Sequence, residues 1–236
     1  FLVLPSAPNG VSCPNNDSAF AWDDDFETVA TNWTGDVGTG ATSGDWNFGR
    51  NGATGSSGTG PSGAQIGTGY MFFDTSGTNT TPAVVVSPAI DLTNATDEAE
   101  ISFYLHSFGE DGTIVDVAVG TSPTGPFTSV FSYTGQLQTA EADPFVLVGA
   151  SLPASVLGNA TVYIQLTGTE EIGNESGFRG DVAIDLMRIE TCGPFCSKPE
   201  ALVVSNVTTV GVDITFNDTN GTAAGAYEYV IQALGT

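Results

Sequence analysis

One acidic residue, Asp185, stands in a strand-like stretch of apolar residues, GDVAIDLMRIETC at 180–192. With the two-residue period of a strand, Val182 and Ile184 point to one side, while Ala183 and Asp185 point to the other. A carboxylate in apolar surroundings is destabilising unless it is paired, hydrogen-bonded or metal-bound. The chain offers only 4 Lys and Arg residues against 27 Asp and Glu. The pattern therefore predicts that Asp185 binds a hard cation such as calcium, which prefers oxygen ligands.

A second interpretation of Asp185 needs no metal. The residue would then lie at a sheet edge, where backbone N–H groups or Arg188 would cap its carboxylate.

Two other acidic stretches are interpreted without metal as well. Residues 23–25 are expected to form a solvated turn, and Glu110 and Asp111 a hairpin turn between two strands.

The residue types needed for hydrolysis are present, but their spacing does not favour catalysis. His106 is the only histidine, and a Ser-His-Asp triad would depend on it. On a strand it would alternate with Ser102 and Tyr104, which favours a structural role. Glycoside cleavage needs two carboxylates, and no pair stands out among the acids. We therefore expect no enzymatic activity. Sugar binding has aromatic candidates in Trp22, Trp33, Trp46, Tyr70 and Tyr133, of which we expect Trp33 and Trp46 to be buried in the core.

Cysteines and sequons point to an extracellular protein. Cys13, Cys192 and Cys196 flank the central region and lack the spacing of zinc ligands. We expect a disulfide that joins the ends of this region, and the pairing among the three cysteines stays open. The pattern Asn-X-Ser/Thr occurs more often than chance predicts, which indicates N-glycosylation and secretion. Its acceptor residues are Asn16, Asn32, Asn79, Asn94, Asn159, Asn174, Asn206, Asn217 and Asn220.

The composition restricts the partners of the protein. A formal net charge of -23 at pH 7 repels phosphate backbones and anionic lipid, so we expect neither nucleic acid nor a membrane surface as partner. No apolar run is long enough for a membrane-spanning helix. Because Phe1 follows no initiator Met, we expect the sequence to be a piece of a longer chain.

The elements that must position these side chains are strands. Short runs with two-residue alternation, separated by Gly, Asn, Asp, Ser and Pro, predict an all-β sandwich. The clearest runs are enough for two packed sheets and span 83–92, 99–108, 113–120, 127–133, 143–152, 160–168 and 181–189. A glycine-rich stretch at 40–69 lacks the Gly-Lys-Ser/Thr ending of a phosphate-binding loop. We expect it to form long loops over the sandwich.

Several motifs of residues 20–192 follow the order of one known family. They are FETVATNW from Phe26, GDWNFGR from Gly44, TGPSGAQIGTGYMFF from Thr59, VSPAIDL at 86–92, ISFYLHSFG at 101–109 and GDVAIDLMRIETC from Gly180. This set resembles the MAM domain, an extracellular adhesion module named for meprin, A5 antigen and receptor phosphatase mu. The resemblance implies a jelly-roll-like antiparallel β-sandwich with an adhesive role. It also implies a structural calcium site, with ligands at Glu27, Asp45 and Asp185.

The tail resembles a second module. After a boundary rich in cysteine and proline, the segments ALVVSNV, GVDITF and YEYVIQALG resemble the first strands of a fibronectin type III domain. We therefore expect a chain of four parts. Residues 1–19 would be a linker or the end of a preceding module, 20–192 the MAM-like sandwich, 193–198 a linker and 199–236 a partial fibronectin type III-like domain.

Together these features predict a secreted, acidic glycoprotein segment that serves in cell adhesion or builds a surface filament. Its expected partners are other surface proteins, copies of itself or glycans. Two alternatives belong to other functional classes: a carbohydrate-binding module, and an accessory domain of a larger secreted hydrolase.

Overall fold

The computed structural model describes most of the chain. The described residues are 5–13, 18–29, 32–38, 44–76, 82–170, 178–192, 200–206, 208, 211 and 213–217. The chain divides into two compact units, Phe1–Gly193 and Pro194–Thr236. Each unit is described by itself.

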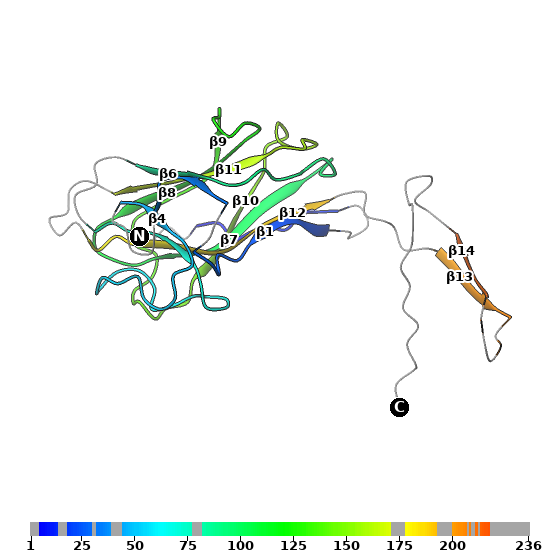
Figure 1. Ribbon diagram of the computed structural model, residues 1–236, viewed down its shortest axis with the longest axis horizontal. Coiled ribbons are helices and arrows are strands. Elements are labelled where there is room, and N and C mark those ends of the chain that lie inside the picture. The colour runs from blue at the N-terminus through cyan, green and yellow to red at the C-terminus, as the bar shows by residue number, and fades with distance from the viewer. Residues whose placement is uncertain are drawn as a thin grey trace. The chain divides into compact units, whose positions relative to one another are not determined.

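Two sheets pack face to face in the first unit (Figure 1). Sheet A contains β1 (Ser18–Asp24), β3 (Val37–Gly38), β4 (Trp46–Asn47), β5 (Met71–Phe73), β7 (Ala99–Ser107), β10 (Val146–Ser151) and β12 (Val182–Cys192). Sheet B contains β2 (Thr34–Gly35), β6 (Ala83–Val86), β8 (Thr113–Gly120), β9 (Thr128–Thr134) and β11 (Tyr163–Glu170). The pairings are antiparallel except that of β3 with β4, so the jelly-roll-like antiparallel β-sandwich is confirmed.

Strand order places β12 in the middle of sheet A. The order is β10-β7-β12-β5-β4-β3, and β1 pairs with the C-terminal half of β12. Sheet B has the order β2-β6-β11-β8-β9. Strands such as β7 and β11 alternate between buried and partly exposed residues, because their inward side chains are buried between the sheets. In β7, for example, Ile101, Phe103 and Leu105 enter the core, and the Phe103 ring lies 5.1 Å from that of Phe131 in the opposite sheet.

The glycine-rich region covers part of the outer face of sheet A. Ala64 packs there against a second apolar cluster that contains Tyr70, Phe72, Phe145 and Ala183. For this reason β5 is buried on both faces and carries no alternation that a sequence pattern could reveal. The expectation that this region forms loops over the sandwich describes residues 49–69 well.

The segment between β7 and β8 is not a hairpin turn. The two strands belong to different sheets, so Glu110 and Asp111 lie in a connection that crosses the edge of the sandwich. Arg179 holds this connection, because its side chain forms an ion pair with Glu110 and its backbone N–H donates to Asp111. The hairpin prediction for this position is therefore wrong.

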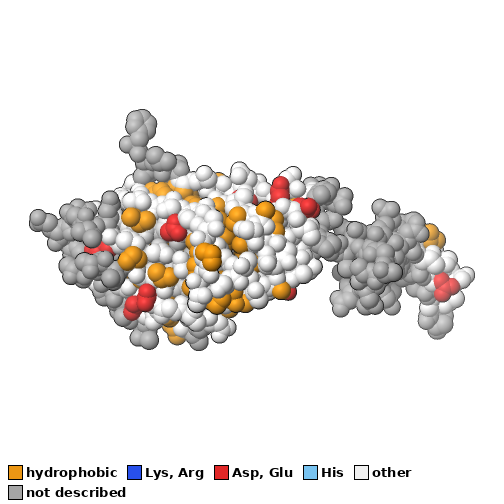
Figure 2. Space-filling view, turned by 90° about the horizontal axis from the view of Figure 1, so that it is seen from above, with side chains coloured by type: hydrophobic (Ala, Val, Ile, Leu, Met, Phe, Trp, Pro, Cys, Tyr) orange, Lys and Arg blue, Asp and Glu red, His pale blue; other side chains and the backbone are white. Residues whose placement is uncertain are grey.

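The face that carries sheet B shows little positive charge. In Figure 2, acidic and scattered hydrophobic side chains stand between uncharged ones, and no Lys or Arg colour is seen among the described residues of this view. Within the described part of the chain, no helix is long and apolar enough to cross a membrane.

The second unit is described only in part. Strands β13 (Glu200–Ser205) and β14 (Asp213–Asn217) pair antiparallel. The third strand expected in the tail, YEYVIQALG, lies outside the described residues. The likeness of the tail to a fibronectin type III domain stays a prediction.

Candidate functional site

Asp185 lies on the central strand of sheet A, and not at a sheet edge. It is opposite Tyr104 of β7 on one side. Directly after it the register of β12 shifts, and Leu186 adopts a left-handed backbone conformation with φ 45°. Before this irregularity β12 pairs with β5, and after it β12 pairs with β1. The Asp185 side chain points to the outer face, under the glycine-rich loops.

The carboxylate of Asp185 is capped by backbone N–H groups. Gln65 and Ile66 both donate to Oδ2 at 2.8 Å, and the side chain is fully buried. Arg188 takes no part in this cap, because its guanidinium lies 4.7 Å above the ring of Phe20. The metal-free interpretation therefore holds for Oδ2, which backbone N–H groups cap.

The other oxygen of Asp185 is less well satisfied. Oδ1 is buried and has no hydrogen-bond partner among the described residues. Burial raises the pKa of this carboxyl group to about 6. The backbone N–H groups of Ile66, Gln65 and Leu186 act against this rise, and the charge of Glu27 adds to it. A cation beside Oδ1 would supply the missing contact and would offset the repulsion from Glu27.

Of the three predicted calcium ligands, the structure brings Glu27 and Asp185 near each other and leaves Asp45 apart. Glu27 accepts hydrogen bonds from the backbone N–H and hydroxyl of Thr68 and from the N–H of Gly69, and these bonds lower its pKa. Asp45 has Asp36 as its charged neighbour; partial burial, followed by the charge of Asp36, raises the pKa of Asp45.

The described residues contain no cluster of three or more His, Cys, Asp or Glu side chains suited to a metal. The unpartnered Oδ1 of Asp185 fits a cation, whereas the fully bonded Glu27 fits one less well. Calcium binding stays a prediction.

His106 is enclosed on the same outer face. Its side chain is fully buried, its ring lies 5.1 Å from that of Phe145, and neither ring nitrogen has a hydrogen-bond partner among the described residues. Burial lowers its pKa to about 4, although the nearby charge of Asp143 acts in the opposite direction. A neutral, buried imidazole agrees with a structural role.

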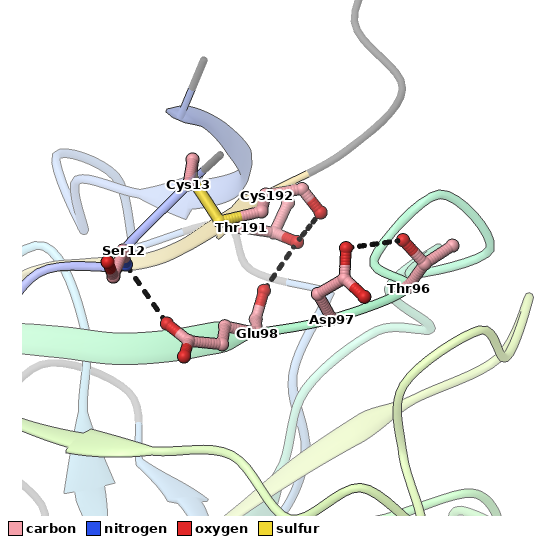
Figure 3. Close-up of a disulfide and its surroundings, with 7 residues drawn as sticks. All are labelled: Ser12, Cys13, Thr96, Asp97, Glu98, Thr191 and Cys192. Atoms are coloured by element: carbon pink, nitrogen blue, oxygen red, sulfur yellow. Dashed lines mark hydrogen bonds between the residues drawn. A yellow bond between two sulfur atoms is a disulfide. The ribbon is translucent and has the colours of Figure 1, made fainter. Parts of the chain in front are cut away.

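A disulfide joins Cys13 to Cys192 and ties the N-terminal segment to the end of β12 (Figure 3). Residues 5–13, here called the N-terminal strap, follow the outer face of sheet A. The strap accepts a bond from Gly149 at the Ser6 carbonyl, and the N–H groups of Asn9 and Ser12 donate to Glu100 and Glu98. Cys196 lies outside the described residues.

The sequons differ in accessibility. Asn32 and Asn94 are exposed. The amide nitrogen of Asn159 donates to the carbonyls of Ser155 and Leu157, and that of Asn206 donates to Asp213. The side chains of the remaining acceptors, Asn16, Asn79, Asn174, Asn217 and Asn220, lie outside the described residues.

A groove of about 320 Å³ lies between the strap and the outer face of sheet A. We call it the outer groove. Strands β1, β12, β7 and β10 supply its floor, and Pro8 and Gly10 of the strap supply one wall. From the disulfide end inward, successive rows of the floor are Phe20, Glu190 and Glu100, then Arg188 and Ser102, then Leu186, Tyr104 and Leu147.

The outer groove combines apolar and polar groups that are open to solvent. Phe20 is 56% exposed and Leu147 40% exposed, whereas large apolar side chains elsewhere in the sandwich are mostly buried. Tyr104 is half-buried, and the Arg188 guanidinium over Phe20 fixes the position of the ring. Glu100 is 4% exposed and accepts from Asn9. Such a surface can stack on a flat apolar ligand face and form hydrogen bonds at its edge.

The aromatic residues considered for sugar binding lie elsewhere. Trp33, Trp46, Tyr70 and Tyr133 are buried, and Trp22 packs against the core. The groove aromatics Phe20 and Tyr104 were missed because they come from strands far apart in sequence. A partial signal existed in 99–108, where Glu100, Ser102 and Tyr104 share the polar face of the predicted strand.

Comparison with known proteins gives structural similarity only. The sequence matches no family profile and no curated protein. Among solved structures, one similar chain is a cleaved adhesin domain of Lys-gingipain from Porphyromonas gingivalis, with 14% identity, a TM-score of 0.46, and coverage of 73% of this chain and 98% of that one. Another is the xylan-binding CBM22-1 domain of Xyn10C from Paenibacillus barcinonensis, with 13% identity, a TM-score of 0.40, and coverage of 75% and 96%.

Proposed function

We propose that this chain is a non-enzymatic extracellular adhesion module that binds glycans through the outer groove. The observation that carries the proposal is the juxtaposition of the exposed Phe20 and the half-buried Tyr104 with the polar side chains of Ser102, Arg188 and Glu190. Sugar rings present an apolar C–H face bordered by hydroxyl groups. Aromatic rings pack against the C–H face, and charged or hydroxyl side chains form hydrogen bonds with the hydroxyl groups.

The size of the groove supports a short ligand segment. Its volume of about 320 Å³ lies near the lower end of the ~300–1,000 Å³ usual for small-molecule sites. At the inner end of the groove, Tyr104 packs against the same apolar cluster as Ala64 of the glycine-rich loops. The strap borders it through Pro8 and Gly10. The groove is therefore a bounded surface, and not a long cleft.

An extracellular location is supported by the Cys13–Cys192 disulfide, because such bonds persist mainly in oxidising compartments. The exposed sequons at Asn32 and Asn94 agree with this location. We also propose that calcium binds at Asp185 and stabilises the sandwich. This part rests on the buried, unpartnered Oδ1 of that residue.

The absence of catalysis is part of the proposal. Glu100 and Glu190 face each other in the groove, and a facing carboxylate pair is what a glycosidase uses. Glu100, however, is almost fully buried and accepts the Asn9 N–H. We expect no release of reducing sugar from any glycan that the protein binds.

The test is binding of the intact chain to a glycan array, followed by calorimetry with the best soluble oligosaccharide. Tyr104→Ala should weaken binding by about tenfold or more, since an aromatic anchor at a contact centre contributes ~2 kcal/mol. Tyr163→Ala is the matched control: Tyr163 is also half-buried, but lies on β11 of sheet B. No retention on the array, or equal losses for both variants, would contradict the proposal.

A further inference from the structure

We infer that the outer groove selects uncharged glycans and excludes those that carry carboxylate or sulfate groups, with Glu100 and Glu190 as the residues that determine this specificity. The inference rests on the proposed function and adds the ligand class. It arises from the row of the groove nearest the disulfide, where two carboxylates stand side by side.

Glu100 and Glu190 are direct cross-strand neighbours. The register of β7 and β12 places them opposite each other, and both line the groove. Directly opposed side chains on adjacent antiparallel strands lie about 5 Å apart at Cβ, where like charges repel. Phe20 continues the same row on β1. A ligand stacked on Phe20 therefore lies beside the two carboxylates and the single guanidinium of Arg188, a local excess of one negative charge.

Little on the protein neutralises this pair. The chain has 4 Lys and Arg residues, and of those in the described part of the chain Arg188 is the one that lines the groove. Its backbone belongs to the next row, but its guanidinium lies over Phe20, at the β1 end of the row that holds the pair. Among the described residues it forms no ion pair with either carboxylate. The N–H of Asn9 donates to Glu100 but carries no full charge.

A polyanionic glycan would lose affinity for two reasons. Its acidic groups would meet the Glu100–Glu190 pair in a partly desolvated groove, where charges interact more strongly than in water. The protein as a whole, at -23, would also slow its approach. A neutral chain meets neither barrier, and its hydroxyl groups can donate hydrogen bonds to the more accessible carboxylate, that of Glu190.

The test compares oligosaccharides of one length on the full chain. The probes are xylohexaose, cellohexaose and mannohexaose as neutral chains and hexagalacturonate as the anionic one, measured by calorimetry at low and at moderate salt. The wild-type protein should bind a neutral probe at least roughly tenfold more tightly than the uronate. The double variant Glu100→Gln/Glu190→Gln should reduce this preference by roughly tenfold, mainly by improving uronate binding.

The control variant, Asp91→Asn/Asp116→Asn, makes the same change in net charge outside the groove. It should leave the preference nearly unchanged, which separates a local effect from the overall charge. If the buried Glu100 does not tolerate substitution, Glu190→Gln alone should still reduce the preference by a few-fold.

The outcomes separate the two proposals. Binding of neither glycan class by any variant would overturn the proposed function. Binding of neutral and anionic probes with equal affinity would overturn the specificity alone. Binding of the uronate more tightly than of the neutral probes, with loss of that binding in Arg188→Met, would overturn it as well. An unchanged preference in the groove variants would also contradict the assignment to Glu100 and Glu190.

Discussion

Asp185 shows how a single carboxylate can depend on a distant part of the chain. Its donors, Gln65 and Ile66, precede it by 120 and 119 positions, and Glu27 holds the far end of the same loop through Thr68 and Gly69. Two acids thus bind four backbone N–H groups within the five-residue stretch 65–69. The sequence indicates that Asp185 needs a partner, but it does not identify a loop so far away.

The raised pKa of Asp185 predicts how stability changes with pH. The folded chain retains the Asp185 proton up to about pH 6, whereas the unfolded chain loses it near the ordinary value of 3.8. The stability from this group is therefore present at low pH and is lost as the pH rises through 6, with a magnitude on the order of 2–3 kcal/mol. Asp181, buried and also raised to about 6, acts in the same direction.

His106 acts in the opposite direction. Its pKa is lowered to about 4 by burial, so the unfolded chain takes up a proton first as the pH falls below 6.5. Its contribution to stability is present above that pH and is lost toward pH 4. The net profile of the wild type mixes these effects, and a variant must separate them.

Asp185→Asn isolates the contribution of one carboxyl group. Measured without calcium, the change in stability that this variant causes should be more favourable at pH 7.5 than at pH 4.5, because only the ionised form of Asp185 is penalised by burial. Thermal or denaturant unfolding at the two pH values measures it. The exposed Asp97→Asn serves as the control. An equal effect of Asp185→Asn at both pH values would contradict the assignment.

The same residue tests the proposed calcium site. If calcium binds at Asp185, it should raise the melting temperature of the wild type at neutral pH by mass action. The double variant Glu27→Ala/Asp185→Asn should lose this response. Asp45→Asn should keep it, because Asp45 lies beside Asp36 and away from the other two acids. If calcium changes the melting temperature of the double variant as much as that of the wild type, or changes neither, the calcium site does not exist.

Among the elements, the N-terminal strap links the disulfide to the groove. Cys13→Ser/Cys192→Ser should destabilise the first unit by about 2–4 kcal/mol. It should also weaken glycan binding, since the strap supplies the Pro8 wall and the Asn9 bond to Glu100. Binding measured well below the melting range separates the two effects. Unchanged affinity in a folded variant would show that the strap has no part in the groove.

The loop at 65–69 fits closely against the strand residues before it. A Cβ on Gly69 would lie 2.7 Å from the Cα of Glu27 and 2.8 Å from the Phe26 carbonyl oxygen. Both are backbone atoms, so Gly69→Ala should force the loop away and cost about 1–3 kcal/mol. Gly63→Ala is the control, because a Cβ there meets nothing within 4 Å. Equal stability of the two variants by chemical denaturation would refute this packing.

Sequence patterns predict the strands whose two faces differ, and they miss the rest. The run at 113–120 coincides with β8, and in its first half the inner residues Thr113 and Val115 are buried while Ile114 and Asp116 are less so. Alternation does not reveal β5, because the glycine-rich loops bury its outer face too. The outer groove could not be predicted, since the register that joins Phe20, Glu190 and Glu100 depends on three strands folding together.

At the scale of the whole molecule, charge is the dominant property. With 27 acids, 4 Lys and Arg residues and a pI near 4.1, the chain repels itself at neutral pH, and this repulsion favours the expanded unfolded state. The ion pair between Arg179 and Glu110 is exposed and contributes little. The fold therefore depends mainly on its apolar core.

This imbalance predicts that simple salt stabilises the protein. Raising NaCl from about 0.01 to 0.15 M shortens the screening length from ~30 to ~8 Å, so the melting temperature should rise by a few degrees and then level off. Choline chloride at equal ionic strength should have the same effect, because screening does not depend on the identity of the cation. Calcium at matched ionic strength should stabilise further only if the Asp185 site binds it, and that excess should vanish in Asp185→Asn. A melting temperature that falls with salt would mean that attractive charge pairs outweigh the repulsion, contrary to the charge distribution of the described residues.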